Sequence, residues 1–145
     1  MTTRKQDIVW AAGFYDGEGS ITMTVAKGYL RLEVACSQKM QLPLLLFKRM
    51  FGGGVYGYKP LRGDICYIWK TYGANGVKFL QTVLPYLIVK AEDAKEVIDI
   101  WENKDYERAI KRHRDRQTAT AKRHAIRAGL VEIEPDDSAS DEGVH

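Results

Sequence analysis

The sequence predicts an α+β fold in which helices cover one face of a four-stranded antiparallel sheet and leave its other face open. Two regions alternate apolar and polar residues with a period of two, which is typical of half-buried strands in hairpins. Helical segments precede, separate and follow these hairpins, which gives the order α-ββ-α-ββ-α-α. The chain has 145 residues, and a domain of this length can bury a core without disulfides or metal ions.

The first helix is predicted around residues 8–15, where two helical turns carry no polar side chain. Thr3 and Gln6 have the spacing of a capping box, and Asp7 is an alternative cap. A helix that is apolar on every side must be covered on every side. One small sheet covers only one side, so we expect a further partner on the other.

The first hairpin is predicted over residues 20–38. Its first strand alternates, with Ile21, Met23 and Val25 on the inward face. A Lys-Gly turn then leads into a second alternating strand.

Glycine and proline mark the bounds of the later elements. A run of three glycines ends the second helix, and Pro85 ends the third. The second hairpin lies between those two helices, and a long helix with an apolar stripe follows them. The predicted elements are a helix at 40–51, strands at 55–59 and 65–72, and helices at 74–84 and 91–114.

The net charge of +3 conceals a division along the chain. Residues 131–145 hold six of the 19 acids and no Lys or Arg, so residues 1–130 are strongly basic. We predict one domain over 1–130, with a basic helical extension at 104–130 and an acidic, disordered tail. Nine bases against three acids at residues 104–127 form either a solvated helix face or an arm that contacts phosphates.

The composition also limits where the protein acts. No run of about 18 apolar residues is present, and the N-terminus lacks the features of a secretory signal. Two cysteines make no disulfide framework. We therefore expect an intracellular protein, cytoplasmic or organellar and not secreted, with no membrane partner and no small-molecule cofactor.

The segment AAGFYDGEG at residues 11–19 places acidic residues where a helix disfavours them. Asp16 and Glu18 lie at the C-terminal end of a helix, where the helix dipole already presents partial negative charge. Such violations tend to mark functional sites, and a divalent cation would reverse the penalty. The alternative is a buried helix that ends in a tight turn with two ordinary surface carboxylates.

Small residues recur on one side of the same helix. Gly13 and Gly17 are four residues apart, a spacing that lets two helix backbones approach closely. The helix could therefore pack against its own copy across a two-fold axis, which would bring two Glu18 carboxylates together. The predicted dimer interface comprises Ala12, Gly13, Asp16 and Gly17.

Residues 11–19 resemble the LAGLIDADG motif of homing endonucleases, with Ala11 in the leading Leu position and Glu18 in the final acidic position. The order of elements over residues 5–103 also matches that family's domain. One copy of the motif is present, which is similar to the single-motif subgroup that works as homodimers. The resemblance implies the homing-endonuclease fold with a saddle-shaped sheet that binds duplex DNA.

The resemblance also implies roles for individual residues. Glu18 matches the catalytic acid that binds Mg²⁺ or Mn²⁺, and the carbonyl of Gly19 can reach the same ion. Gln38 resembles the polar residue that orders water, and Lys90 the basic residue beside the scissile phosphate. Asp16 resembles a structural support at the helix end.

Outward strand residues of such a sheet would face the major groove of DNA, which carries a full base code. Each could instead be an ordinary solvated residue. The candidates are Thr22, Thr24, Arg31, Glu33, Lys59, Arg62 and Lys70.

The sequence thus predicts a site-specific homing endonuclease. As a homodimer it would make metal-dependent double-strand cuts in a long, near-palindromic DNA target. Two alternatives on the same fold remain. One is a maturase-like factor that assists splicing of intron RNA, and the other is a DNA-binding regulator without cleavage.

Overall fold

The structure is a computed structural model that describes residues 4–130. The chain divides into two compact units between Lys111 and Arg112. The predicted acidic tail at 131–145 and the predicted cap Thr3 lie outside the described residues.

The first unit confirms the predicted α+β order of elements. Apart from the last helix, each element begins and ends within a few residues of its predicted bounds. The elements are α1 (Lys5–Glu18), β1 (Gly19–Ala26), β2 (Tyr29–Gln38), α2 (Gln41–Phe51), β3 (Gly54–Tyr58), β4 (Cys66–Tyr72), α3 (Gly73–Val83), the short 3₁₀ helix η1 (Leu84–Tyr86), α4 (Ala91–Asn103) and the start of α5 (Tyr106–Arg127).

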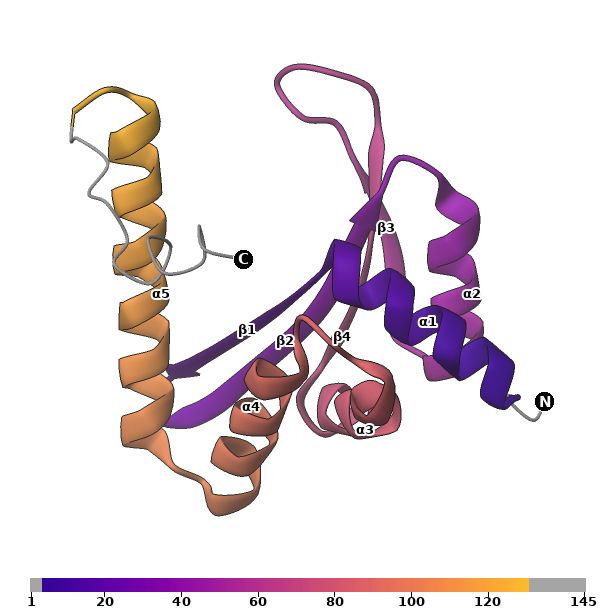
Figure 1. Cartoon of the computed structure of the whole chain (residues 1–145), viewed down its shortest axis with the longest axis horizontal. Coiled ribbons are helices and arrows are strands. Elements are labelled where there is room, and N and C mark those ends of the chain that lie inside the picture. Colours follow the sequence, from indigo (N-terminus) through magenta and orange to yellow (C-terminus); the bar gives the residue numbers. More distant parts are fainter. Residues whose placement is uncertain (1–3, 131–145) are drawn as a thin grey trace, which may run out of the picture. The chain divides into compact units, whose positions relative to one another are not determined.

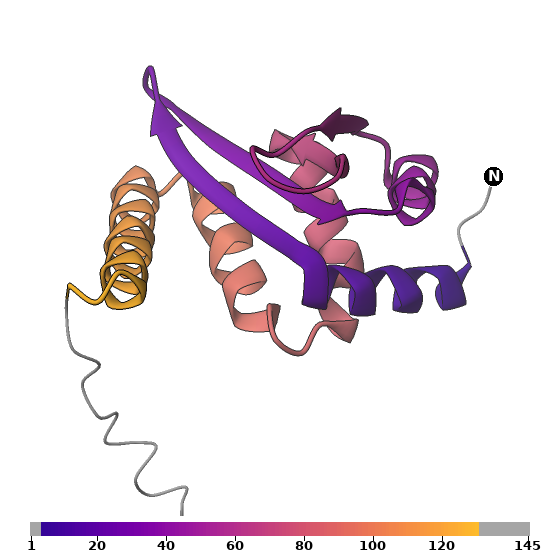
Figure 2. The same ribbon diagram turned by 90° about the horizontal axis from the view of Figure 1, so that it is seen from above.

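The four strands form one antiparallel sheet in the order β1-β2-β4-β3 (Figure 1). The two hairpins join through their inner strands, where β2 and β4 pair from Glu33 opposite Tyr72 to Gln38 opposite Tyr67. Helices α1, α3 and α4 lie along one side of this sheet (Figure 2). One face is therefore covered by helices, and the other is left open.

The alternation predicted for the first hairpin is present. Ile21 and Met23 are buried against the helices, whereas Thr22 between them is exposed. The turn is made by Lys27 and Gly28, which both have positive φ angles, 53° and 81°. Two positive φ values in a two-residue turn are typical of type I′, whose twist matches that of the strands.

An aromatic cluster joins the sheet to the helices. Phe47 of α2 and Phe79 of α3 lie with their ring centroids 5.1 and 5.0 Å from that of Trp69 in β4. The indole Nε1 of Trp69 donates a hydrogen bond to the carbonyl of Gly52 at 2.8 Å. Tyr15 of α1 packs edge-on against Phe79. These buried rings fix the end of α1 relative to the sheet.

The helix α1 buries only one of its sides. The carboxylate of Asp7 accepts a hydrogen bond from the N–H of Arg4 at 3.4 Å, so Asp7 supports the first turn. Gly13 and Gly17 are exposed. Ala12 is instead fully buried in the chain's own core. The expectation that Ala12 lies at a dimer interface is therefore wrong, because it has no exposed surface to offer.

The single long helix predicted over 91–114 is also wrong. The chain breaks after Asn103, where Lys104 adopts a left-handed conformation with φ 51°. The carboxylate of Asp105 then accepts a hydrogen bond from the N–H of Arg108 at 3.2 Å and caps α5. Asp99 pairs with Arg108 and holds the corner between the two helices.

The described part of the second unit is the C-terminal portion of α5, which ends at Arg127. This portion carries six of the nine bases counted in residues 104–127. Among the helices of residues 4–130, none combines the length and the apolar character that a membrane crossing requires.

Candidate active site

The candidate site begins where α1 passes directly into β1. Glu18 ends the helix and Gly19 begins the strand, with no loop between them. A Cβ atom on Gly19 would lie 2.4 Å from the ring of Tyr15, so only glycine fits there. The hydroxyl of Tyr15 donates a hydrogen bond to the carbonyl of Ser20 at 2.7 Å. Tyr15 thus fixes the junction that presents Glu18.

Glu18 is exposed, and within residues 4–130 its carboxylate forms no hydrogen bond or ion pair. The buried thiol of Cys36, which lies in β2 opposite Gly19, is close enough to feel the charge of Glu18. Burial, with the added repulsion of the Glu18 carboxylate, raises the pKa of Cys36 to about 12. The thiol therefore stays neutral and leaves the Glu18 carboxylate as the available ligand.

Asp16 has a different role because its carboxylate is fully engaged within the chain. It accepts hydrogen bonds from the N–H groups of Ile88, Val89 and Lys90 at 2.9, 3.0 and 2.8 Å. Burial works against ionisation, but these three bonds and the Lys90 charge hold the pKa of Asp16 below its usual value. The ionised carboxylate binds residues 88–90 to the end of α1.

The same contact brings Lys90 to the motif. The ammonium of Lys90 donates a hydrogen bond to the main-chain carbonyl of Asp16 at 2.6 Å. Its Nζ also lies 6.0 Å from the ring centroid of Tyr15. The last carbonyls of a helix lack partners within the helix, so the end of α1 is a favourable place for a cation.

Gln38 lies at the end of β2, two residues beyond the position opposite Gly19. It is half-buried, and its Oε1 accepts a hydrogen bond from the N–H of Lys39 at 2.8 Å. In the described part of the chain, no hydrogen bond joins Gln38 to Glu18. The register thus brings Gln38 to the same end of the sheet as Glu18.

The described residues of one copy do not make a complete metal site. In residues 4–130, no group of three or more His, Cys, Asp or Glu side chains is placed to hold an ion. The available hard oxygen atoms at the junction are the Glu18 carboxylate and the carbonyl of Gly19, since Asp16 is engaged. These atoms suit Mg²⁺ chemically, but they form an incomplete ligand set.

The open face of the sheet gathers most of the predicted DNA-binding residues. Thr22 lies opposite Glu33, and Thr24 lies opposite Arg31. These four line a hollow that reaches Tyr72 in β4. Lys70 borders a second hollow on the same face. Lys59 and Arg62 lie beyond the strands, exposed in the connection from β3 to β4.

The aromatic half of this open face was not predicted from the sequence. Tyr56, Tyr58, Ile68 and Tyr72 line the second hollow together with Lys70. Their spacing in the sequence could have indicated that they share a face, because alternate positions of a strand face the same side. This half of the sheet therefore presents phenol and aliphatic groups rather than charges.

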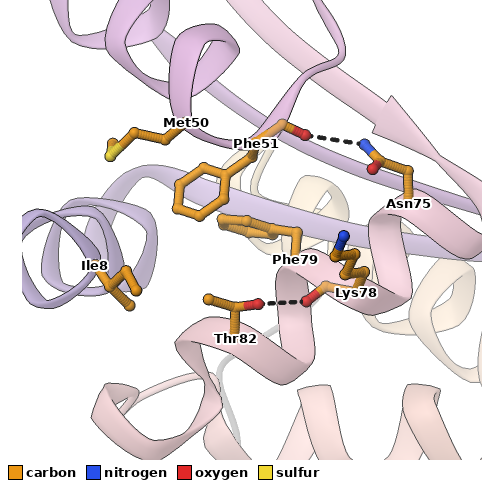
Figure 3. Close-up of a pocket in the computed structure, with 7 residues that line it drawn as sticks. All are labelled: Ile8, Met50, Phe51, Asn75, Lys78, Phe79 and Thr82. Atoms are coloured by element: carbon orange, nitrogen blue, oxygen red, sulfur yellow. Dashed lines mark hydrogen bonds between the residues drawn. The ribbon is translucent and has the colours of Figure 1, made fainter. Parts of the chain in front are cut away.

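A separate pocket lies in the helix layer (Figure 3). Its apolar walls come from Ile8, Met50, Phe51 and Phe79. Two of its polar side chains are already engaged: Asn75 donates to the carbonyl of Phe51, and Thr82 donates to that of Lys78. The residues that line it include no carboxylate, so it lacks the chemistry of the α1–β1 junction.

The uncovered side of α1 carries glycines and apolar side chains. A Cβ atom on Gly13 or Gly17 would meet nothing within 4 Å, so packing within the described chain does not require glycine at either position. Glycine inside a helix costs roughly 0.5–1 kcal/mol relative to alanine. Val9 and Trp10 are 44% and 40% exposed on the same helix. Together these residues form an uncovered surface along α1.

A second uncovered apolar segment lies beside the end of α1. Ile88 and Val89 are 86% and 78% exposed, although their N–H groups bind Asp16. Their exposure was not predicted from the sequence, because isolated apolar residues in a loop give no periodic signal.

Comparison with known proteins gives matches at the level of structure. No protein-family model matches the chain, and no curated protein matches it significantly. The homing endonuclease I-CvuI, solved in complex with its target in the presence of Ca, is 26% identical, with a TM-score of 0.57 over 68% of this chain and 69% of that one.

Two further solved structures support the same fold. The archaeal intron-encoded homing endonuclease I-Vdi141I, complexed with DNA, is 20% identical, with a TM-score of 0.55 over 67% of each chain. The homing endonuclease I-TnaI is 21% identical, with a TM-score of 0.52 over 72% of this chain and 76% of that one.

Proposed function

We propose that this chain, a member of the LAGLIDADG homing endonuclease family with a single motif, is a site-specific DNA endonuclease. The observation that carries the proposal is the junction of α1 and β1. Among residues 4–130, Glu18 is exposed there and forms no hydrogen bond or ion pair, and Asp16 holds Lys90 at the end of the same helix. The structural likeness to I-CvuI in complex with its target supports the same conclusion.

Glu18 and the carbonyl of Gly19 would hold Mg²⁺ or Mn²⁺. I-CvuI was solved with DNA in the presence of Ca and of Mg, which supports a divalent ion here. When bound, such an ion supplies charge stabilisation at the phosphate and activation of water. Lys90 would add positive charge beside the scissile phosphate, and Gln38 would orient water.

A second copy of the chain would complete the site. Two helices can approach closely where Gly13 and Gly17 leave open space, and the exposed Val9 and Trp10 would be covered by the contact. A two-fold axis along α1 would bring two Glu18 carboxylates together, which supplies the ligands that one copy lacks. Such a homodimer requires a target of near-palindromic sequence.

The open sheet face would lie in the major groove of duplex DNA. Thr22, Thr24, Arg31, Glu33 and Lys70 are on this face, and Lys59 and Arg62 would reach outward from the β3–β4 connection. Residues 1–130 would act as the DNA-binding and cleavage domain, with the bases of residues 104–127 contacting phosphates.

The test uses a duplex in which the two DNA flanks of this protein's gene are joined without the insertion. We expect double-strand cleavage with Mg²⁺, none with EDTA, and none from Glu18→Gln, which should still bind the duplex. Glu96→Gln, which alters an exposed carboxylate on α4, is the matched control and should cleave normally. Binding without metal-dependent cutting would overturn the proposal in favour of a regulator, and activity on intron RNA alone would favour a maturase.

A further inference from the structure

The open face of the sheet has two chemically different halves. The β1–β2 half presents Thr22, Thr24 and Arg31. The β3–β4 half presents Tyr56 and Tyr72 with other apolar and phenolic groups. An ion pair lies at the border between these halves, and its two members come from the central strands β2 and β4.

This pair is formed by Glu33 and Lys70. The Nζ of Lys70 lies 3.1 Å from the Oε1 of Glu33, and the two side chains are 30% and 36% exposed. Glu33 lies opposite Tyr72, and Lys70 lies opposite Ala35, so the two are diagonal neighbours across the β2–β4 ladder. The hydrogen bond that Lys70 donates to the Glu33 carboxylate raises the pKa of Lys70, which keeps the ammonium charged.

Pairing changes what each group can do against DNA. A free lysine binds phosphate oxygens without regard to sequence, which strengthens non-specific binding. The carboxylate of Glu33 neutralises Lys70 and repels phosphates, so the pair is poorly suited to the DNA backbone. It offers instead one donor beside one acceptor, which is the kind of pattern that a base pair can match.

We propose that Glu33 and Lys70 act as one unit that reads a single G·C base pair in each half of the target. Lys70 would donate to O6 and N7 of guanine, and Glu33 would accept from the N4 amine of cytosine. An A·T pair separates its acceptors and adds the thymine methyl group, so the ammonium would find fewer acceptors there. This inference rests on the proposed function, because it needs the open face in the major groove.

The test is a binding selection from duplexes with a randomised central stretch. Wild-type protein should enrich G·C at one position in each half-site, by about tenfold to a hundredfold over the other pairs. Lys70→Met and Glu33→Gln should each lose that preference. Glu33→Gln should also bind random-sequence DNA more tightly and with a steeper salt dependence, by about one phosphate contact, because Lys70 is freed.

The decisive variant exchanges the two groups. Glu33→Lys combined with Lys70→Glu keeps an ion pair but reverses donor and acceptor, so the preferred pair at that position should change from G·C to C·G. The matched control is Glu92→Gln, which removes a carboxylate that also lies 3.1 Å from a lysine, Lys95, but on α4. It should leave every base preference unchanged.

The outcomes distinguish the base-reading role of Glu33 and Lys70 from the nuclease function on which it rests. If the wild type enriches a sequence but the single variants and the exchanged pair enrich the same one, the reading role of Glu33 and Lys70 is overturned and the nuclease proposal stands. If the wild type enriches no sequence and cuts no duplex, both are overturned. Thermal unfolding of each variant, expected to match the wild type, shows that a lost preference is not a lost fold.

Discussion

Asp16 and Lys90 are joined by two hydrogen bonds, both donated by Lys90 and accepted by Asp16. The N–H of Lys90 donates to the Asp16 carboxylate at 2.8 Å, and the ammonium of Lys90 donates to the Asp16 carbonyl at 2.6 Å. The end of the motif helix and the segment before α4 are thereby joined across 74 residues of sequence. The ionised Asp16 carboxylate therefore helps to hold Lys90 at the end of α1.

Replacing Asp16 with asparagine should loosen this segment. The neutral amide retains one acceptor oxygen, so all three N–H groups lose a charged partner and at least one loses its acceptor. We expect the free energy of unfolding to fall by about 1–3 kcal/mol and cleavage to fall with it. Chemical denaturation and single-turnover cleavage would measure both effects. Asp64→Asn, at an exposed site in the β3–β4 connection, should change neither.

A bulky side chain at Gly13 should separate the two copies. The position is open within the chain, so Gly13→Leu should fold normally but clash with a closely packed second α1. We expect sedimentation to show a dimer for the wild type and a monomer for the variant. Ala74→Leu, on an exposed turn of α3, adds similar bulk elsewhere and should stay dimeric. A monomeric wild type, or an unaffected Gly13→Leu dimer, would contradict the predicted interface.

A substitution in the hairpin turn between β1 and β2 should raise the stability of the fold. Lys27 has φ 53°, which costs a residue with an ordinary side chain roughly 1–2 kcal/mol, whereas asparagine accepts this conformation more readily. We expect Lys27→Asn to stabilise the fold by roughly 0.5–1 kcal/mol. Gly28→Ala should destabilise it, since Gly28 has φ 81°. Equal unfolding midpoints for the two variants would refute this account of the turn.

The two cysteines should differ in reactivity. Cys36 is buried with a pKa raised to about 12, whereas Cys66 is half-buried at the start of β4. A thiol-specific reagent at neutral pH should therefore label Cys66 first and reach Cys36 only after unfolding. Mass spectrometry of the native and denatured protein would show the order, with Cys66→Ser as the control. Equal labelling rates in the native state would mean that the Cys36 thiol is accessible to the reagent and would contradict its burial.

Local patterns were enough to predict much of the fold. The alternation of Ile21 and Met23 identified β1, and the glycines after Phe51 marked the end of α2. The break at Lys104 was missed because the apolar stripe of α4 runs close to it, although Asp105 offered a capping signal.

The candidate site was predictable only in part. Glu18 could be singled out because a carboxylate at a helix C-terminus is locally unfavourable. The hydrogen bonds of Asp16 to residues 88–90 join segments far apart in sequence, and no local pattern encodes such a contact. The burial of Ala12 was not predicted for a related reason. Helical spacing shows which residues share a face of the helix, but in a helix that is apolar all round it does not show which face packs against the core.

The absence of a loop between α1 and β1 has a mechanical consequence. A loop would absorb small rotations of the helix, but Gly19 follows Glu18 directly and is wedged against Tyr15. Any rotation of α1 is therefore transmitted to Thr22 and Thr24 further along the same strand. In the proposed homodimer, a change in how the two copies meet would then also move these strand residues relative to the DNA, so assembly and target choice would evolve together.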